Sequence, residues 1–306
     1  MGKIPVLFVF FNRREETLKA IEAIKEYKPT KLYLASDGYR ENKKGEEQTV
    51  IDLRNEIISL IDWDCEVKTL FRDKNLGCCK AVSSAIDWMF SQEEYGIIIE
   101  DDCIVQNSFW NYMEELLELY KDDQRIGAIC GFNTLGAYKT EHSYVFSNFK
   151  SCWGWATWKR AWKNLDMDMQ WLKSCQKEDV INNYGYNGKD KRENIFKIHK
   201  LKNHLVNSWA WRWYFSLAAH NQLCIFPSVN LVSNIGFGEN STHTKSKAPS
   251  NSVACEELAF PLKHPQYIVP CKGFDADFHK DLYSIKRRIR NILIPLWVYK
   301  LISKQK

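Results

Sequence analysis

Three carboxylates stand together at Glu100-Asp101-Asp102, directly after the apolar and largely β-branched run from 96 to 99. Such a run is typical of an interior strand in a sheet that is covered on both faces. In open α/β sheets, ligands bind beyond the carboxyl ends of the strands, where clustered carboxylates suit a hard divalent cation such as Mg2+ or Mn2+. Acidic residues also follow strands simply to solvate a turn or cap a helix, so the local pattern alone leaves both interpretations open.

Two earlier strands are also predicted to end in polar side chains. Asn12-Arg13 follows the apolar run from 4 to 11, and Asp37-Gly38 follows the run that begins at Lys31. If the strands are parallel, these side chains and the acidic triplet meet at one rim of the sheet. Arg13 could neutralise phosphate there, and Asp37 could accept hydrogen bonds from a base or ribose. An Asp-Gly pair is also an ordinary turn.

The elements that must position these residues alternate between strand and helix. Predicted strands cover residues 4–11, 31–35, 66–71, 96–99, 126–131 and 223–226, and predicted helices cover 14–27, 48–61, 78–90, 108–120 and 208–220. This alternation indicates an α/β fold with a Rossmann-like, mostly parallel sheet flanked by helices. We expect one catalytic domain over residues 1–275 and a basic amphipathic segment, ending in a helix, over 276–306.

Charge and cysteine content exclude several classes of protein. The net charge of the 306 residues is +5, but residues 280–306 hold eight basic residues and one acid, so the remainder carries −2. General nucleic-acid binding by the folded domain is therefore disfavoured. The ten cysteines include no C-x-x-C pair, which favours free thiols over a structural zinc. No secretion signal is visible, so a cytoplasmic location is expected.

The C-terminal segment combines basic residues with an apolar stretch from 292 to 299 that is too short to span a bilayer. This composition suits the surface of an anionic membrane, such as the inner face of the cell membrane. A terminal helix packed on the domain is the alternative interpretation.

Several linked motifs resemble GT-A glycosyltransferases. The nearest match is the bacterial group labelled hemolytic-protein-like, which is similar to N-acetylglucosaminyltransferase I. The resemblance covers roughly residues 4–245. It rests on Asn12-Arg13, Asp37-Gly38, Asn75-Leu76-Gly77, the strand with its acidic triplet through Cys103, the tryptophan-rich stretch from Trp153 to Trp162, and the stretch from Asn234 to Thr244.

The resemblance implies a role for each matching residue. Asp37 would bind uracil, and Asp102 would hold the Mn2+ or Mg2+ ion that bridges the diphosphate, with His243 as a further candidate metal ligand. The remaining expected contacts of the nucleotide sugar are Asn12, Arg13, Asn75, Gly77, Asp101 and Gly238. A divalent cation neutralises the charge that develops on the diphosphate as the sugar leaves.

One departure from the family concerns the base that deprotonates the acceptor hydroxyl. The family carries an aspartate in a tryptophan-flanked segment, whereas the corresponding stretch from Ser208 to Trp213 has no carboxylate. Glu239, Asp168 and His243 are alternative candidates for the base. Alternatively, the enzyme retains the anomeric configuration and the departing phosphate takes the proton, or the chain is catalytically weakened.

Aromatic side chains could form the acceptor site. The indole faces of Trp153, Trp155, Trp209 and Trp211 could stack on sugar rings, although tryptophans are also common core residues. Arg212 could hold an acidic or phosphorylated acceptor, or form an ion pair on a helix surface.

These patterns predict a metal-dependent glycosyltransferase. It would move a sugar from a nucleoside diphosphate, with UDP preferred, to a saccharide acceptor that can be lipid-linked, in bacterial surface polysaccharide or glycoconjugate assembly. One alternative is a sugar-phosphate nucleotidyltransferase, but such enzymes usually carry a glycine-rich loop after the first strand, and residues 11–15 contain no glycine. The other is a non-catalytic, membrane-docked module that binds nucleotide sugars. The sequence leaves open the donor sugar, acceptor, linkage, stereochemistry and oligomeric state.

Overall fold

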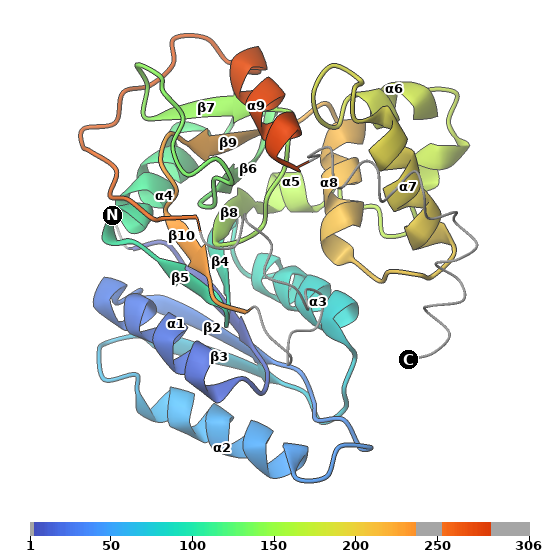
Figure 1. The fold of residues 1–306 in the computed structure, drawn as a ribbon. Coiled ribbons are helices and arrows are strands. Elements are labelled where there is room, and N and C mark those ends of the chain that lie inside the picture. The colour runs from blue at the N-terminus through green and yellow to red at the C-terminus, as the bar shows by residue number, and fades with distance from the viewer. Residues whose placement is uncertain (1–2, 237–252, 283–306) are drawn as a thin grey trace.

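A twisted eight-stranded sheet forms the centre of the protein (Figure 1). The computed structural model describes residues 3–236 and 253–282. The strand order is β3-β2-β1-β4-β8-β6-β9-β7, and β10 pairs with β5 in a separate antiparallel ribbon. The strands are β1 (Val6–Phe10), β2 (Lys31–Ser36), β3 (Glu66–Phe71), β4 (Tyr95–Glu100), β5 (Cys103–Val105), β6 (Ile126–Cys130), β7 (Tyr144–Ser147), β8 (Trp155–Trp158), β9 (Leu223–Pro227) and β10 (Val232–Asn234).

The first half of the chain builds the parallel half of the sheet. β1 pairs in parallel with β2 and β4, and β2 pairs in parallel with β3. The connecting helices are α1 (Arg14–Tyr27), α2 (Glu46–Ser59) and α3 (Cys78–Phe90). The carboxyl ends of these four strands therefore lie along one edge of the sheet. The predicted mostly parallel α/β fold is confirmed.

Two antiparallel strands of the eight-stranded sheet, like the short β5–β10 ribbon, were not predicted from the sequence. β8 lies between β4 and β6 and is antiparallel to both, and β7 is antiparallel to β9 at the edge of the sheet. Both have four residues, all of them buried. Each strand includes a buried polar residue, Ser147 or Thr157, so neither gives the uninterrupted apolar run that indicated the other interior strands.

Helices cover the sheet on both faces (Figure 1). The core on one face includes side chains of α1, α2 and α4 (Asn107–Leu119). The core on the other face includes α3 and most of the helices that follow β8. These are α5 (Lys159–Trp162), α6 (Lys177–Asn182), α7 (Lys191–Lys202), α8 (Trp209–Ala219) and α9 (Lys272–Leu282), together with the 3-10 turn η1 (Gln170–Lys173).

The last described helix belongs to the folded domain. Phe274 and Phe278 of α9 are buried: Phe278 stacks on Phe149, and Phe274 packs at a tilt against Phe226. The predicted domain boundary at residue 275 therefore falls inside α9, and the predicted basic helix beyond it lies outside the described residues. Within the described part of the chain, no helix combines the length and apolar character needed to cross a membrane.

Candidate nucleotide-sugar site

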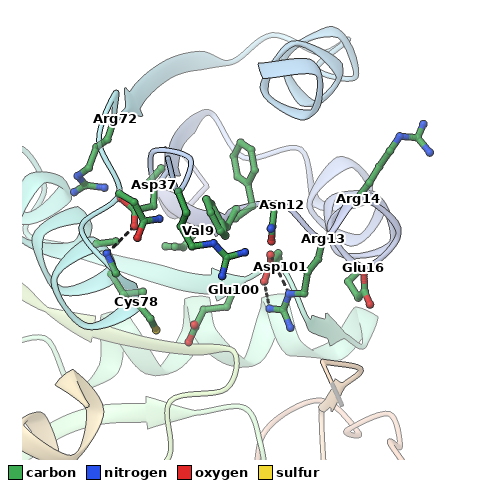
Figure 2. A pocket seen from close by; sticks show the side chains of 18 of the residues that line it. Val9, Asn12, Arg13, Arg14, Glu16, Asp37, Arg72, Cys78, Glu100 and Asp101 are labelled. Atoms are coloured by element: carbon green, nitrogen blue, oxygen red, sulfur yellow. Dashed lines mark hydrogen bonds and ion pairs between the residues drawn. The ribbon is translucent and has the colours of Figure 1, made fainter. Parts of the chain in front are cut away.

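A cavity of about 710 Å3 opens at the carboxyl ends of β1, β2, β3 and β4 (Figure 2). Its lining includes six residues predicted from the sequence to bind the nucleotide sugar: Asn12, Arg13, Asp37, Asn75, Gly77 and Asp101. The volume lies within the range typical of small-molecule sites. The structure thus brings together side chains from distant parts of the chain, at the edge where ligands of α/β sheets bind.

Asp37 organises the wall of this cavity. Its carboxylate accepts hydrogen bonds from the backbone N–H groups of Gly38 (3.0 Å), Leu76 (2.9 Å) and Gly77 (2.9 Å). Its side chain is buried, and it thereby ties the end of β2 to the loop that leads into α3. Both carboxylate oxygens already accept backbone hydrogen bonds, a structural role that the sequence did not reveal beside the predicted contact with uracil.

Two arginines reinforce the same end of the cavity. Arg54 donates from Nη2 to the backbone oxygens of Asp37 (2.9 Å) and Arg72 (2.8 Å). Arg72 lines the cavity beyond Asp37, and its Nη2 donates to Ser84 Oγ at 2.7 Å (Figure 2). Burial lowers the pKa of Arg72, with partial compensation from Asp37. Arg72 forms no ion pair with any described residue, so it offers a donor to a ligand at this end.

A second network closes the cavity near the end of β1. Glu46, at the start of α2, is buried and accepts hydrogen bonds from Asn12 Nδ2 (2.9 Å) and from the backbone and guanidinium of Arg40. Asn12 is therefore held by Glu46 and lines the cavity beside Arg40. Sequence analysis did not find Glu46, because its partners lie on separate loops.

The opposite end of the cavity is acidic and is neutralised by Arg13. The Arg13 guanidinium pairs with Asp101 and lies 3.0 Å from Asp102 Oδ2. Burial opposes the charge on Arg13, but the two aspartates outweigh it and raise the pKa of Arg13 above its usual range. The side chains of Asp101 and Asp102 are 7% and 18% exposed, so Asp102 is the more accessible of the two.

The end of β10 holds Asp102 in place. Asn234 Nδ2 donates to Asp102 Oδ1 at 3.1 Å, and the Ile235 N–H donates to the Asp102 backbone oxygen at 2.8 Å. At Gly236 a Cβ atom would overlap the Asp102 carboxylate and crowd the guanidinium of Arg13. Only glycine allows the backbone to approach the carboxylate this closely.

Asp102 fits the role of a ligand for Mg2+ or Mn2+. Its carboxylate offers hard oxygen donors in an oriented and partly exposed position at the end of β4. The described residues contain no group of three or more His, Cys, Asp or Glu side chains placed to hold a metal. Such cations are commonly bound by one or two carboxylates together with substrate phosphates and water, which is the arrangement this site can provide.

Glu100 faces the other side of β4. Side chains alternate along a strand, so Glu100 shares a face with Ile98 in the core that contains α3 and α8. Figure 2 shows its carboxylate directed away from the Arg13–Asp101 pair, on the side of Cys78. Burial, followed by the nearby Asp102 and Asp101 charges, raises the pKa of Glu100 to about 8. No described residue donates a hydrogen bond to this carboxylate, which leaves it available to a ligand.

Two of the four tryptophans predicted to bind the acceptor are core residues. Trp155 is fully buried and Trp209 is 4% exposed, and their rings stack 5.9 Å apart. A sugar cannot reach these indole faces in this structure, which corrects the prediction for both residues. Trp153 and Trp211 are partly exposed, and Trp153 packs edge-on against Phe132.

Of the predicted base candidates, only Asp168 belongs to the described residues, and it does not line the cavity. Asp168 is exposed, and its backbone N–H donates to Asp166 Oδ1. Gly238, Glu239 and His243 lie outside the described residues.

Arg212 lies in the first half of α8, which packs beside α3, and it donates to the backbone oxygens of Met167 (2.9 Å) and Ser208 (3.0 Å).

Comparison with known proteins gives only distant structural likeness. No family model and no curated protein matches this chain. The mannosyltransferase PcManGT from Pyrobaculum calidifontis, in complex with GDP-Man and Mn2+, is 12% identical with a TM-score of 0.36, and the match covers 51% of this chain and 45% of that chain. The glycosyltransferase GlyE of Streptococcus pneumoniae TIGR4 is 14% identical with a TM-score of 0.34 over 64% and 44%. A UDP-glucose pyrophosphorylase complexed with UDP-glucose is 11% identical with a TM-score of 0.37 over 76% and 92%.

The chain thus matches less than half the length of PcManGT and GlyE. These structures include both glycosyltransferases and a nucleotidyltransferase, at low identity. Scores at this level do not establish an activity for this chain, so its function has to be argued from its own residues.

Proposed function

We propose that the protein is a metal-dependent glycosyltransferase that uses a nucleoside-diphosphate sugar. The observation that carries the proposal is a cavity with two chemically different ends. Arg72 and the loop held by Asp37 form one end, and Arg13 with Glu100 and Asp101 forms the other, where Asp102 pairs with Arg13 just beyond the lining. The ends lie on β3 and β4, which are separated by β2 and β1. Three strand spacings correspond to roughly 14 Å, which suits a nucleoside diphosphate lying along the edge.

In this arrangement the nucleoside would lie against β2 and β3, with Asp37, Asn75 and Gly77 shaping its pocket. UDP is the donor nucleotide that the family resemblance favours, and Arg72 could donate to a carbonyl oxygen of its uracil. The diphosphate would lie near Arg13 and Asp102. When bound at Asp102, Mn2+ or Mg2+ would supply Lewis-acid stabilisation of the charge on the diphosphate. Arg13 would orient Asp101 and Asp102 through its ion pairs.

The sugar would then lie on the side of Glu100 and α8. Glu100 would accept hydrogen bonds from its hydroxyls, because this carboxylate lines the cavity and no described residue donates to it. Trp153, Trp211 and Arg212 remain proposed contacts of a saccharide acceptor. Glu239, Asp168 and His243 remain predicted candidates for the base, and a retaining mechanism without a protein base stays an equal alternative.

The loop after β1 favours a glycosyltransferase over a sugar-phosphate nucleotidyltransferase. β1 ends at Phe10 and α1 begins at Arg14, so only residues 11–13 separate them. This connection contains no glycine, and the Arg13 side chain fills the space beside the acidic triplet. A nucleotidyltransferase that cradles a nucleotide with a glycine-rich loop would need backbone N–H groups at this place.

The proposed setting is the cytoplasmic face of a bacterial membrane, with a surface polysaccharide or glycoconjugate as product. The basic composition of residues 283–306 supports this part of the proposal. A non-catalytic binding module is the alternative, favoured by the alanine at position 210 in the first turn of α8.

A panel of nucleotide sugars incubated with the protein and Mn2+ tests the activity. Hydrolysis or transfer of at least one donor, stopped by chelation of the metal, is the expected result, and NMR of the product would show retention or inversion. Tight binding of a nucleotide sugar with no turnover of any donor would instead identify a binding module. Formation of pyrophosphate from a sugar phosphate and a nucleoside triphosphate would identify a nucleotidyltransferase.

A further inference from the structure

A second basic region lies in the folded domain, away from the cavity. Residues 189–202 hold six lysines and arginines against two acids, so they carry +4 of a total charge of +5. One of the acids, Asp190, is fully buried and bonded to His279. With the +7 of residues 280–306 set aside as well, the rest of the chain carries −6. The basic character of the protein is thus concentrated in two segments.

Two of these basic residues, Arg192 and Lys202, lie on one exposed face of α7. Asn194, Ile198 and Leu201 form its buried side. Arg192, Ile195, His199 and Lys202 recur at spacings of three and four residues, which places them together on the outward side. Arg192 and Lys202 are exposed and form no ion pair with any described residue. Their charges therefore face solvent.

Apolar surface lies among these charges. Ile195 is 46% exposed, although apolar residues of this size are usually buried in a soluble domain. A shallow depression of about 360 Å3 is lined by Gly188, Lys189, Lys191, Arg192 and Ile195. The Lys189 ammonium lies 4.5 Å from the ring centre of Tyr186, and that of Lys200 lies 4.5 Å from the ring centre of Phe196. Lys191 differs from the others because it pairs with Glu178 at 2.6 Å.

The described chain ends near the start of α7. His279 Nδ1 lies 2.9 Å from Asp190 Oδ1, directly before the first residue of α7. α9 ends at Leu282, three residues later, which is less than one helical turn. The described chain therefore ends close to the first turn of α7.

We propose that the outward face of α7, formed by Arg192, Ile195, His199 and Lys202 together with Lys189 just before the helix, binds the surface of an anionic lipid bilayer. Basic side chains attract acidic headgroups, and an apolar residue among them enters the boundary between headgroups and acyl chains. Long basic side chains keep their charge in the headgroup layer while their stems cover apolar surface. The face adds a rigid contact to whatever the C-terminal segment contributes, and so determines how the domain is oriented on the membrane. The proposal is independent of the transferase activity.

Co-sedimentation of the full chain with vesicles of equal parts phosphatidylglycerol and phosphatidylcholine tests the proposal. The test variant is Lys189→Gln/Arg192→Gln/Lys202→Gln. A matched control, Lys19→Gln/Lys43→Gln/Lys44→Gln, removes the same charge from exposed positions elsewhere. Each basic residue near an anionic surface changes binding by a factor on the order of five, so we expect the test variant to bind about tenfold to a hundredfold more weakly. The control should stay within about twofold of the unmodified chain, because surface charges that face solvent are screened by salt.

Ile195→Ser, which leaves the charge unchanged, should also weaken vesicle binding and should not alter the far-ultraviolet circular dichroism. Equal binding by the test and control variants would overturn the proposal, as would a failure of the unmodified chain to bind anionic vesicles. The protein could instead bind a column of acidic polypeptide through the α7 face and fail to bind vesicles. That result would also overturn the proposal and would assign the face to a protein partner.

Discussion

Replacing Asp37 with asparagine should destabilise the protein as well as weaken nucleotide binding. The carboxylate accepts backbone hydrogen bonds from Gly38, Leu76 and Gly77 with both of its oxygens. An asparagine keeps one acceptor and turns an NH2 group toward a backbone N–H, so at least one bond is lost and two donors face each other. Hydrogen bonds to a charged group contribute about 1.5–3 kcal/mol each, and a buried donor left without a partner adds a similar cost. We expect the free energy of unfolding to fall by about 2–4 kcal/mol.

Urea denaturation of Asp37→Asn, beside the control Asp73→Asn, measures this loss. Asp73 lies in the loop between β3 and α3, which also contains Leu76 and Gly77. It is exposed and accepts no hydrogen bond from a described residue. The control should change the free energy of unfolding by no more than about 0.5 kcal/mol, as expected of an exposed substitution. If both variants are equally stable while only Asp37→Asn binds UDP more weakly, Asp37 acts on the ligand alone and its structural role is refuted.

Three further substitutions test other parts of the structure. Gly236→Ala should weaken UDP binding measured with Mn2+ by tenfold or more, because a Cβ would displace the Asp102 carboxylate. A tenfold change corresponds to about 1.4 kcal/mol, and unchanged affinity would contradict this prediction. Trp155→Ala should lower the free energy of unfolding by about 3–5 kcal/mol in urea denaturation, since the indole is fully buried, and a loss below about 1 kcal/mol would return it to the acceptor site. Burial raises the pKa of Asp275 to about 6, so the native state binds this proton more tightly than the unfolded chain, and the stability it contributes is lost as the pH rises through 6. The unmodified protein should therefore gain about 1 kcal/mol from this group between pH 7 and pH 5, and Asp275→Asn should lack that gain in urea denaturation at the two pH values.

The sequence was sufficient for the features that depend on local pattern. The apolar runs before Asn12, Asp37 and the acidic triplet predicted parallel strands, and the carboxyl ends of those strands do lie at one edge. The antiparallel strand from Trp155 to Trp158 was missed because buried aromatic residues in a short strand have the same composition as an exposed aromatic platform.

Contacts between distant loops could not be predicted in the same way. The partners of Asp37 include backbone N–H groups about 40 positions away, and a backbone group leaves no signature in the side-chain sequence. The ion pairs of Arg13 with Asp101 and Asp102 depend on β1 lying next to β4, which alternation of elements alone does not specify. The approach of Gly236 to Asp102 likewise follows from the pairing of β10 with β5.

Binding of UDP measured by titration calorimetry, with and without Mn2+, tests the central claim most directly. We expect Mn2+ to strengthen the binding of UDP to the unmodified protein. In Asp102→Asn this strengthening should disappear, so that affinity with Mn2+ falls by about tenfold or more to the metal-free value, while Asp73→Asn behaves as the unmodified protein does. Equal dependence on Mn2+ in the unmodified protein and Asp102→Asn would contradict the assignment of Asp102, and no binding of any nucleoside diphosphate to the unmodified protein would contradict the proposed function.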